Sequence, residues 1–424
     1  MLNRLESFIL DINNIDRKNV IWNIVASISN SFQSMLLMLI LTRQGNVEGA
    51  SYIAIGFAVA NLLMTIGKFG VRNYQVTDVE EKYDFSTYFR LRFVTVSAMI
   101  LGCVVYGGYN MIFKSYTLNK LIVVELVCLY KIIESIEDVY HGRLQQKGLL
   151  CIASKIWSIR SITFIVEFFV IYWLTQDVLV TLLVDVITSM VLALGLNSIP
   201  KEKYGIFENT NKKQIFGLMY SCVAIAIATF LLMYISNAPK YIIDSYVTDD
   251  EQAKINILLM VIYVVTLLSN FMFNPIINKL AVINLQKKYK ELITKILVLC
   301  AGIGIIVVVG IIFAELIGRK LLGWIYKVSL EDYRSELLLI IIAGGLIALL
   351  NLFYMIIIML RKQKIFYVVF TIATLILMIF GREVLIKFQF GGLCVFYNII
   401  LLVTSGSLMV YSLSIMCKKR RSND

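Results

Sequence analysis

Residues 149–196 read LLCIASKIWSIRSITFIVEFFVIYWLTQDVLVTLLVDVITSMVLALGL. Two apolar runs, 149–174 and 178–196, are separated here by only three residues. A helix needs about 17 to 25 mostly apolar residues to cross a hydrocarbon core of about 30 Å, so each run is long enough to span a membrane. The stretch therefore predicts two transmembrane helices that cross the bilayer in opposite directions.

The rest of the chain repeats this pattern. Of its 424 residues, 59% are apolar and 16% are charged, whereas about a quarter of the residues in a soluble domain are charged. This composition excludes a soluble protein and predicts an all-α integral membrane protein with about twelve spans. The predicted span cores are 21–41, 50–66, 88–106, 121–136, 149–174, 178–196, 215–235, 255–277, 292–313, 337–359, 365–380 and 394–416.

The longest polar segment in mid-chain, residues 197–213, separates six predicted helices from the other six. It contains Pro200, four lysines and a cluster of Asn and Thr, which is typical of a linker. We predict an N-terminal six-helix lobe at 1–196, a cytoplasmic linker at 197–213 and a C-terminal six-helix lobe at 214–424.

Basic residues are distributed unevenly between the loops. If the N-terminus is cytoplasmic, the inner segments carry about 24 Lys and Arg residues and the outer segments about 11. The positive-inside rule then places both termini in the cytoplasm, in a multi-pass protein of the cell membrane. The net charge of +12 follows from this bias and does not indicate a nucleic-acid partner. Residues 1–18 lack the order of a cleaved signal and predict a short amphipathic helix.

The sequence lacks the residues that several kinds of chemistry require. No G-x-x-x-x-G-K-[ST] phosphate loop is present and His141 is the only histidine, so neither ATP hydrolysis nor a His-based catalytic site is predicted. The seven cysteines include no C-x-x-C pair and mostly fall in apolar runs. That pattern favours packing roles over a metal site or disulfides. We expect a protein that is not an enzyme and that holds no cofactor or metal.

Charged side chains inside the predicted spans are candidates for function, because each costs about 2.5 to 3.5 kcal/mol to insert. At about 1.5 Å per residue, Arg160 and Lys131 lie near the midplane and Lys155 lies nearer the inner end. Arg160 has no acid three or four residues away, so it is the leading candidate to bind an anion. The alternative for Arg160 is helix packing with bonds to backbone carbonyls, and the alternative for Lys131 is pairing with Glu134.

Two carboxylates lie at similar depths on neighbouring predicted helices. Glu167 and Asp185 each fall about 10 Å below the outer edge of their spans. Two acids that approach each other in a low dielectric can share a proton, so we predict that this pair couples transport to an ion. The alternative is that each is paired or hydrated separately.

Three segments resemble a known family of transporters. They are KFGVRNYQVTD (68–78), IESIEDVYHGRLQQKG (133–148) and SNAPKYIID (236–244). They resemble the polysaccharide, or lipid-linked oligosaccharide, flippases of the multidrug/oligosaccharidyl-lipid/polysaccharide exporter superfamily, and the resemblance extends over nearly the whole chain. It implies two six-helix lobes around a cationic cavity that accepts the pyrophosphate of a polyprenyl-linked sugar. The anion contacts that it implies in this sequence are Arg72, Lys155, Arg160 and Lys240.

The resemblance and the midplane cations together predict a flippase. It would move polyprenyl-pyrophosphate-linked oligosaccharide repeat units from the inner to the outer leaflet by alternating access, for cell-surface polysaccharide biosynthesis. Its partners would be this substrate, membrane lipid, glycosyltransferases and a polysaccharide polymerase.

Other functions stay open at this point. An ion-coupled drug or metabolite antiporter of the same superfamily would favour acidic and aromatic residues in its cavity. A peptidoglycan-precursor flippase would be expected to have more spans. A membrane polymerase or acyltransferase would need a larger outer loop, and a scaffold for glycan assembly would need no transport site.

Overall fold

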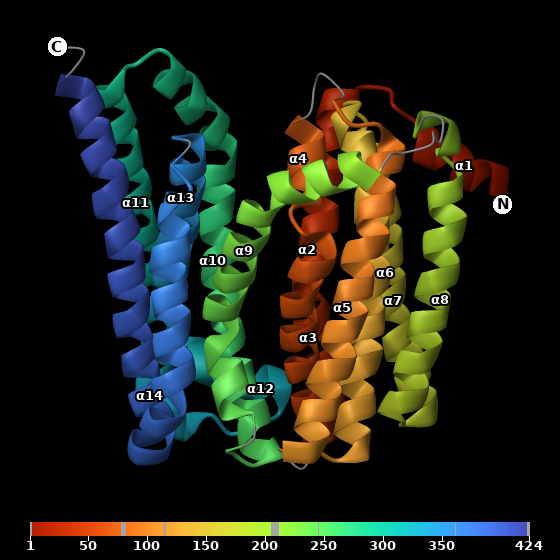
Figure 1. The fold of residues 1–424 in the computed structure, drawn as a ribbon. Coiled ribbons are helices and arrows are strands. Elements are labelled where there is room, and N and C mark those ends of the chain that lie inside the picture. Colours follow the sequence, from red (N-terminus) through yellow and green to blue (C-terminus); the bar gives the residue numbers. More distant parts are fainter. Residues whose placement is uncertain are drawn as a thin grey trace. The chain divides into compact units, whose positions relative to one another are not determined.

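The computed structural model describes residues 2–77, 82–113, 116–204, 212–244, 246–360 and 362–421. These residues are almost entirely helical and form no strand (Figure 1). Ten helical segments within them are long and apolar enough to cross a membrane. Two more complete the predicted set. The long helix α6 (Leu118–Gln146) carries more charge than the others, and α14 (Ile365–Arg421) is two helices joined at Gln389, where φ is 55° and ψ is −166°. The predicted all-α membrane fold is confirmed.

The chain divides into two compact units, Met1–Met233 and Tyr234–Asp424, each with its own packed interior. The helices of the first unit are α1 (Leu2–Leu10), α2 (Ile15–Arg43), α3 (Val47–Lys68), α4 (Val71–Thr77), α5 (Phe85–Phe113), α6, α7 (Leu150–Thr175), α8 (Val178–Ser198) and the first part of α9 (Lys212–Ile243). Those of the second unit are the remainder of α9, α10 (Asp249–Leu285), α11 (Tyr289–Phe313), α12 (Arg319–Tyr326), α13 (Arg334–Met359) and α14.

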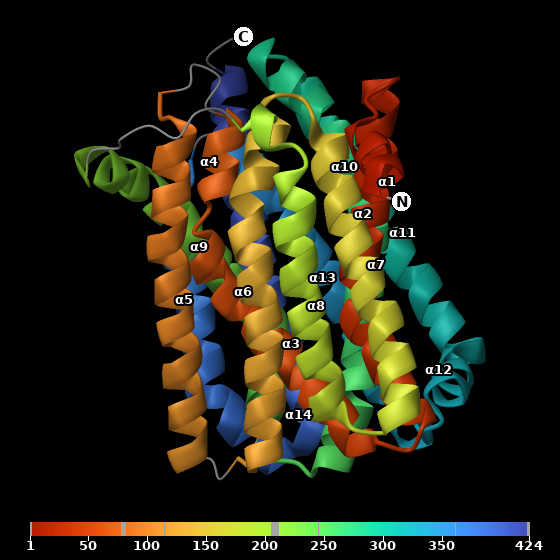
Figure 2. The same ribbon diagram turned by 90° about the vertical axis from the view of Figure 1, so that its right-hand side faces the viewer.

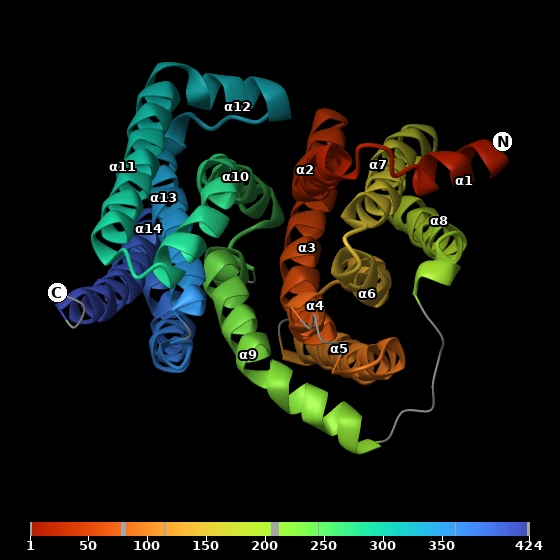
Figure 3. The ribbon, with the colours of Figure 1, turned by 90° about the horizontal axis from the view of Figure 1, so that it is seen from above.

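Helix α6 lies in the interior of the first unit. It packs against α3, α5, α7 and α8. Figure 2 shows α5, α6, α8 and α7 along one face of this unit, and the view from above in Figure 3 shows α6 among them. Close approach of α3 to α6 depends on glycine, because a Cβ added at Gly56 would lie 3.3 Å from Val127. Because α6 packs against these four helices, its charged face lies against other helices of the unit.

The second unit is built around α13, which packs against α10, α11 and α14. Two adjacent glycines of α13 make this possible. A Cβ added at Gly344 would lie 2.9 Å from Val265 of α10, and one added at Gly345 would lie 2.2 Å from Val307 of α11. Small residues at helix contacts let backbones approach closely inside a membrane, where lipid offers no hydrophobic drive for association.

The boundary between the units lies within α9. Residues 205–211, the middle of the predicted linker, lie outside the described residues. The helix that follows begins in the first unit, where Leu218 and Cys222 are buried in an apolar cluster with Tyr83 and Phe85. The beginning of α9 thus packs with the N-terminal helices, and the compact units separate beyond the predicted linker.

The short helix expected before the first span is α1. It buries Ile9 completely and leaves Arg4, Glu6 and Ser7 exposed, so its two faces differ as predicted. That an even number of spans brings both termini to the cytoplasm stays a prediction.

Candidate functional site

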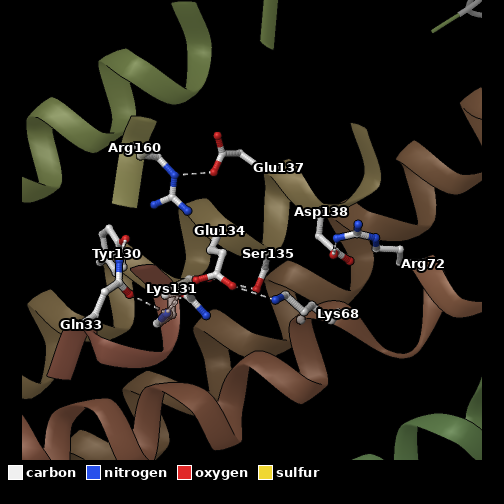
Figure 4. A network of polar contacts seen from close by, with 12 residues as sticks. Gln33, Lys68, Arg72, Tyr130, Lys131, Glu134, Ser135, Glu137, Asp138 and Arg160 are labelled. Atoms are coloured by element: carbon white, nitrogen blue, oxygen red, sulfur yellow. Dashed lines mark hydrogen bonds and ion pairs between the residues drawn. The ribbon is translucent and has the colours of Figure 1, made fainter. Parts of the chain in front are cut away.

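An ion-pair network lies inside the first unit, with its acids on α6 (Figure 4). Glu134, Glu137 and Asp138 occupy one face of this helix, because side chains three and four residues apart project together. Each is at most 5% exposed. A buried carboxylate is costly unless it is paired, so each must find a cation on α6 or on a neighbouring helix. The network consists of Lys68, Arg72, Arg92, Lys131, Glu134, Glu137, Asp138 and Arg160.

Glu134 joins two lysines. Lys131 Nζ donates to Glu134 Oε2 at 2.7 Å, and it also reaches the amide oxygens of Asn30 at 3.2 Å and Gln33 at 3.3 Å on α2. Lys68 Nζ, at the end of α3, donates to Glu134 Oε1 at 2.8 Å. The side chain of Lys131 is 2% exposed and that of Lys68 is 29% exposed. Lys131 thus pairs with Glu134 in the structure, which is the alternative stated for it from the sequence.

Asp138 joins two arginines. Arg92 of α5 donates from Nη2 to Asp138 Oδ2 at 2.8 Å and from Nη1 to the carbonyl of Gly67 at 2.5 Å. That carbonyl is near the C-terminal end of α3, where a cation complements the helix dipole. Arg72 of α4 donates to Asp138 Oδ1 at 3.3 Å and to Gln145 Oε1 at 2.8 and 3.0 Å. Arg92 is buried, and the side chain of Arg72 is 24% exposed.

Arg160 of α7 is fully buried. Its Nε lies 2.6 Å from Glu137 Oε2, and its guanidinium carbon lies 4.9 Å from the centre of the Tyr130 ring. Asn197 of α8 donates to the other oxygen of Glu137 at 2.9 Å. Neither Nη group of Arg160 has a hydrogen-bond acceptor among the described residues. Arg160 thus has an acidic partner on another helix and retains two NH₂ groups without an acceptor in the described part of the chain, and in this conformation solvent does not reach it.

The network contains more positive than negative charge. Among the described residues, five cations are bonded to three carboxylates, which leaves two positive charges in excess. Buried charge without compensation is unfavourable, so this surplus favours the approach of an anion. The partly exposed side chains of Lys68 and Arg72 form the accessible edge of the network, and Arg160 and Lys131 lie behind it.

Lys155 lies outside the network, although it is on the same helix as Arg160. Its Nζ donates to the backbone carbonyls of Phe8 at 2.7 Å and Asp11 at 2.8 Å. These carbonyls lie at the C-terminal end of α1, where they lack partners within that helix. Lys155 therefore anchors α1 to α7. In the turn that follows α1, a hydrogen bond donated by Lys18 lowers the pKa of the Asp11 carboxyl.

Lys240 belongs to the second unit. It is 5% exposed, and its Nζ lies 5.0 Å from the centre of the Tyr263 ring. Of the five predicted substrate contacts, the structure brings together Arg72, Lys131 and Arg160.

The two predicted coupling acids lie on helices that pack together. Thr188 of α8 donates to Glu167 Oε1 of α7 at 2.7 Å. Thr188 is three residues from Asp185 and on the same face of α8, so Glu167 lies against the face that carries Asp185. Asp185 is fully buried, and neither of its carboxylate oxygens has a hydrogen-bond donor among the described residues. Their role in ion coupling stays a prediction.

Within the network, sequence reasoning selected Arg72, Lys131 and Arg160 as candidates and named Glu134 only as a possible partner of Lys131. It did not select the other four members, Lys68, Arg92, Glu137 and Asp138. Glu137 is the acid that Arg160 lacks on its own helix. The available signal was the spacing of Glu134, Glu137 and Asp138, which gives one helix a concentrated acidic face. Such a face inside a bundle requires cations from its neighbours.

Comparison with solved structures identifies the fold. The MATE multidrug transporter DinF-BH, solved in complex with a ligand, matches with a TM-score of 0.68 and 12% identity, over 93% of this chain and 94% of that one. An inward-facing multidrug resistance MATE family transporter of the MOP superfamily matches with a TM-score of 0.62 and 13% identity, over 95% and 100%. A MOP superfamily transporter from Pyrococcus furiosus, described by the reverse polarity of its binding pocket, matches at 0.50 and 13%, over 93% and 96%.

No protein-family model matches the sequence, and no curated protein matches it significantly. Identities of 12 and 13% to these solved structures establish the fold alone. The chain has the fold of the MATE transporters of the MOP superfamily.

Proposed function

We propose that this protein flips polyprenyl-pyrophosphate-linked oligosaccharide repeat units from the inner to the outer leaflet by alternating access, for cell-surface polysaccharide biosynthesis. The observation that carries the proposal is the surplus of positive charge in the ion-pair network of the first unit. Glycosyltransferases would supply this substrate and a polysaccharide polymerase would consume it.

A pyrophosphate that crosses a low-dielectric slab loses hydration, and cations in its path compensate for that loss. Arg72 and Lys68 would make the first contacts, because they are the partly exposed cations of the network. Arg72 is held by Asp138 at 3.3 Å, and a guanidinium suits phosphate oxygens because its fork of donors can bind two of them. The pyrophosphate would thus replace the carboxylate of Asp138 as the partner of Arg72. Without substrate, Arg72 would stay paired with Asp138.

Arg160 would enter the site in a second conformation. Its two Nη groups have no acceptor among the described residues, yet the side chain is fully buried. Contact with the substrate therefore requires α7 to move relative to α6. Solved transporters of this fold include one described as inward-facing and one described as outward-facing, which supports proposing such movements for this chain.

The second candidate is an ion-coupled antiporter for cationic compounds. Two observations favour it. The solved structures of this fold include multidrug transporters, and Asp185 has both carboxylate oxygens without a donor among the described residues. The description of the Pyrococcus furiosus protein, in which reversed pocket polarity suggests a different function, supports treating pocket charge as the discriminating feature within this fold.

The test uses purified full-length protein in vesicles with a fluorescent polyprenyl-pyrophosphate oligosaccharide. Flipping is measured as the fraction of label that becomes accessible in the opposite leaflet. Arg72→Gln and Lys68→Gln should each slow flipping, whereas Lys295→Gln, which removes an exposed pair with Glu291, should not. Absence of flipping together with proton-driven efflux of cationic dyes would favour the antiporter and reject the flippase.

A further inference from the structure

Three side chains that are typical metal ligands meet between α5 and α6, outside the ion-pair network. The sulfur atoms of Cys103 and Cys128 and a carboxylate oxygen of Glu125 all lie within 4.8 Å of one another. Cys103 is 3% exposed and Cys128 is 1% exposed, and Glu125 is partly exposed. The sequence predicts packing roles for these cysteines because they form no C-x-x-C pair. The antiparallel pairing of α5 with α6 brings them together.

The spacing of these residues fits a site shared by two helices. Glu125 and Cys128 are three residues apart on one face of α6, and Cys103 and Gly107 are four residues apart on one face of α5. A Cβ added at Gly107 would lie 2.6 Å from Glu125 Oε1. Glycine at this position therefore leaves room for the carboxylate beside the two thiols.

We infer that Cys103, Glu125 and Cys128 bind a divalent transition-metal ion of the Zn²⁺ class. Thiolate and carboxylate ligands suit zinc, at about 2.3 Å for sulfur and about 2.0 to 2.2 Å for oxygen. Those bond lengths place tetrahedral ligand atoms about 3.5 to 4 Å apart, so small side-chain rotations from the observed positions are enough. Three protein ligands leave the fourth position for water or another donor.

The charges of such a site suit its surroundings. Each thiol releases one proton to solvent when it coordinates the ion, and the two thiolates then cancel the charge of the metal. The remaining negative charge belongs to Glu125, the ligand that is partly exposed. Binding would pin α5 to α6, six or more residues along α6 from Glu134, the nearest acid of the ion-pair network. The inference does not depend on the proposed flippase activity.

The experiment is a Co²⁺ titration of reduced, purified full-length protein, read by thiolate-to-cobalt absorption and followed by displacement with Zn²⁺. We expect one ion per chain. Cys103→Ser and Cys128→Ser should each abolish the thiolate band, and Glu125→Gln should weaken binding at least tenfold. Cys222→Ser, which removes a buried thiol of the same unit outside the cluster, should bind as the wild type does.

A second measurement guards against variants that fold poorly. Zn²⁺ should raise the melting temperature of the wild type and of Cys222→Ser, because a ligand that binds the native state stabilises it, and it should not raise that of Cys103→Ser. Cobalt binding without a thiolate band, or equal loss in Cys222→Ser, would overturn the inference. So would a Cys103–Cys128 disulfide in protein that, once reduced, binds no metal.

Discussion

Arg160 and Glu137 allow structural and transport roles of a buried ion pair to be separated. Arg160→Met removes the cation and keeps similar volume. Glu137→Gln removes the carboxylate and keeps an oxygen that can accept from Asn197, which now donates to Glu137 at 2.9 Å. The two substitutions and their combination form a double-mutant cycle.

The expected magnitudes follow from burial. The side chains of Arg160 and Glu137 are 0% and 3% exposed, so removal of either partner leaves a buried charge unpaired. We expect each single change to cost about 3 to 5 kcal/mol in unfolding free energy. Loss of the guanidinium over the Tyr130 ring adds about 0.5 to 2 kcal/mol to Arg160→Met. The double variant has no unpaired charge and should recover most of the loss.

The assay combines denaturant unfolding of detergent-purified protein with lipid flipping in vesicles. The control cycle uses Lys295→Met and Glu291→Gln, whose side chains are 42% and 45% exposed, and should give less than about 1 kcal/mol. If Arg160 contacts the pyrophosphate, the double variant will be stable and will not flip substrate. Recovery of both stability and flipping would reduce Arg160 to a packing role, and wild-type stability in both single variants would refute the electrostatic argument itself.

Three further predictions test other parts of the account. Lys155→Met should detach α1, because Lys155 holds its C-terminal carbonyls, and limited proteolysis before residue 15 should then become faster. Glu167→Gln combined with Asp185→Asn should flatten the pH dependence of transport, and an unchanged profile would remove these acids from ion coupling. Ser422→Cys should resist an impermeant thiol reagent in intact cells, and labelling from outside would contradict cytoplasmic termini.

The apolar runs of the sequence predicted where the chain crosses the membrane. Hydrophobic length is a local property, so the span cores, including the more charged 121–136, correspond to helices in the structure. The break at Gln389 likewise falls between the predicted cores 365–380 and 394–416. The charges of Lys131 and Arg160 also signalled from sequence that the first unit has a polar interior.

Only the tertiary structure decided which charges meet. Arg160 pairs with Glu137 on a different helix, and Lys155, one and a half turns from Arg160, bonds to α1 instead. Helix packing and the rotation of each helix about its axis determine these pairings, and neither is a property of a single segment. For the same reason, the sequence did not predict the cluster of Cys103, Glu125 and Cys128. Its members come from two helices whose register is set by packing. The sequence thus determined the spans and the presence of buried charge, and the fold determined the partners.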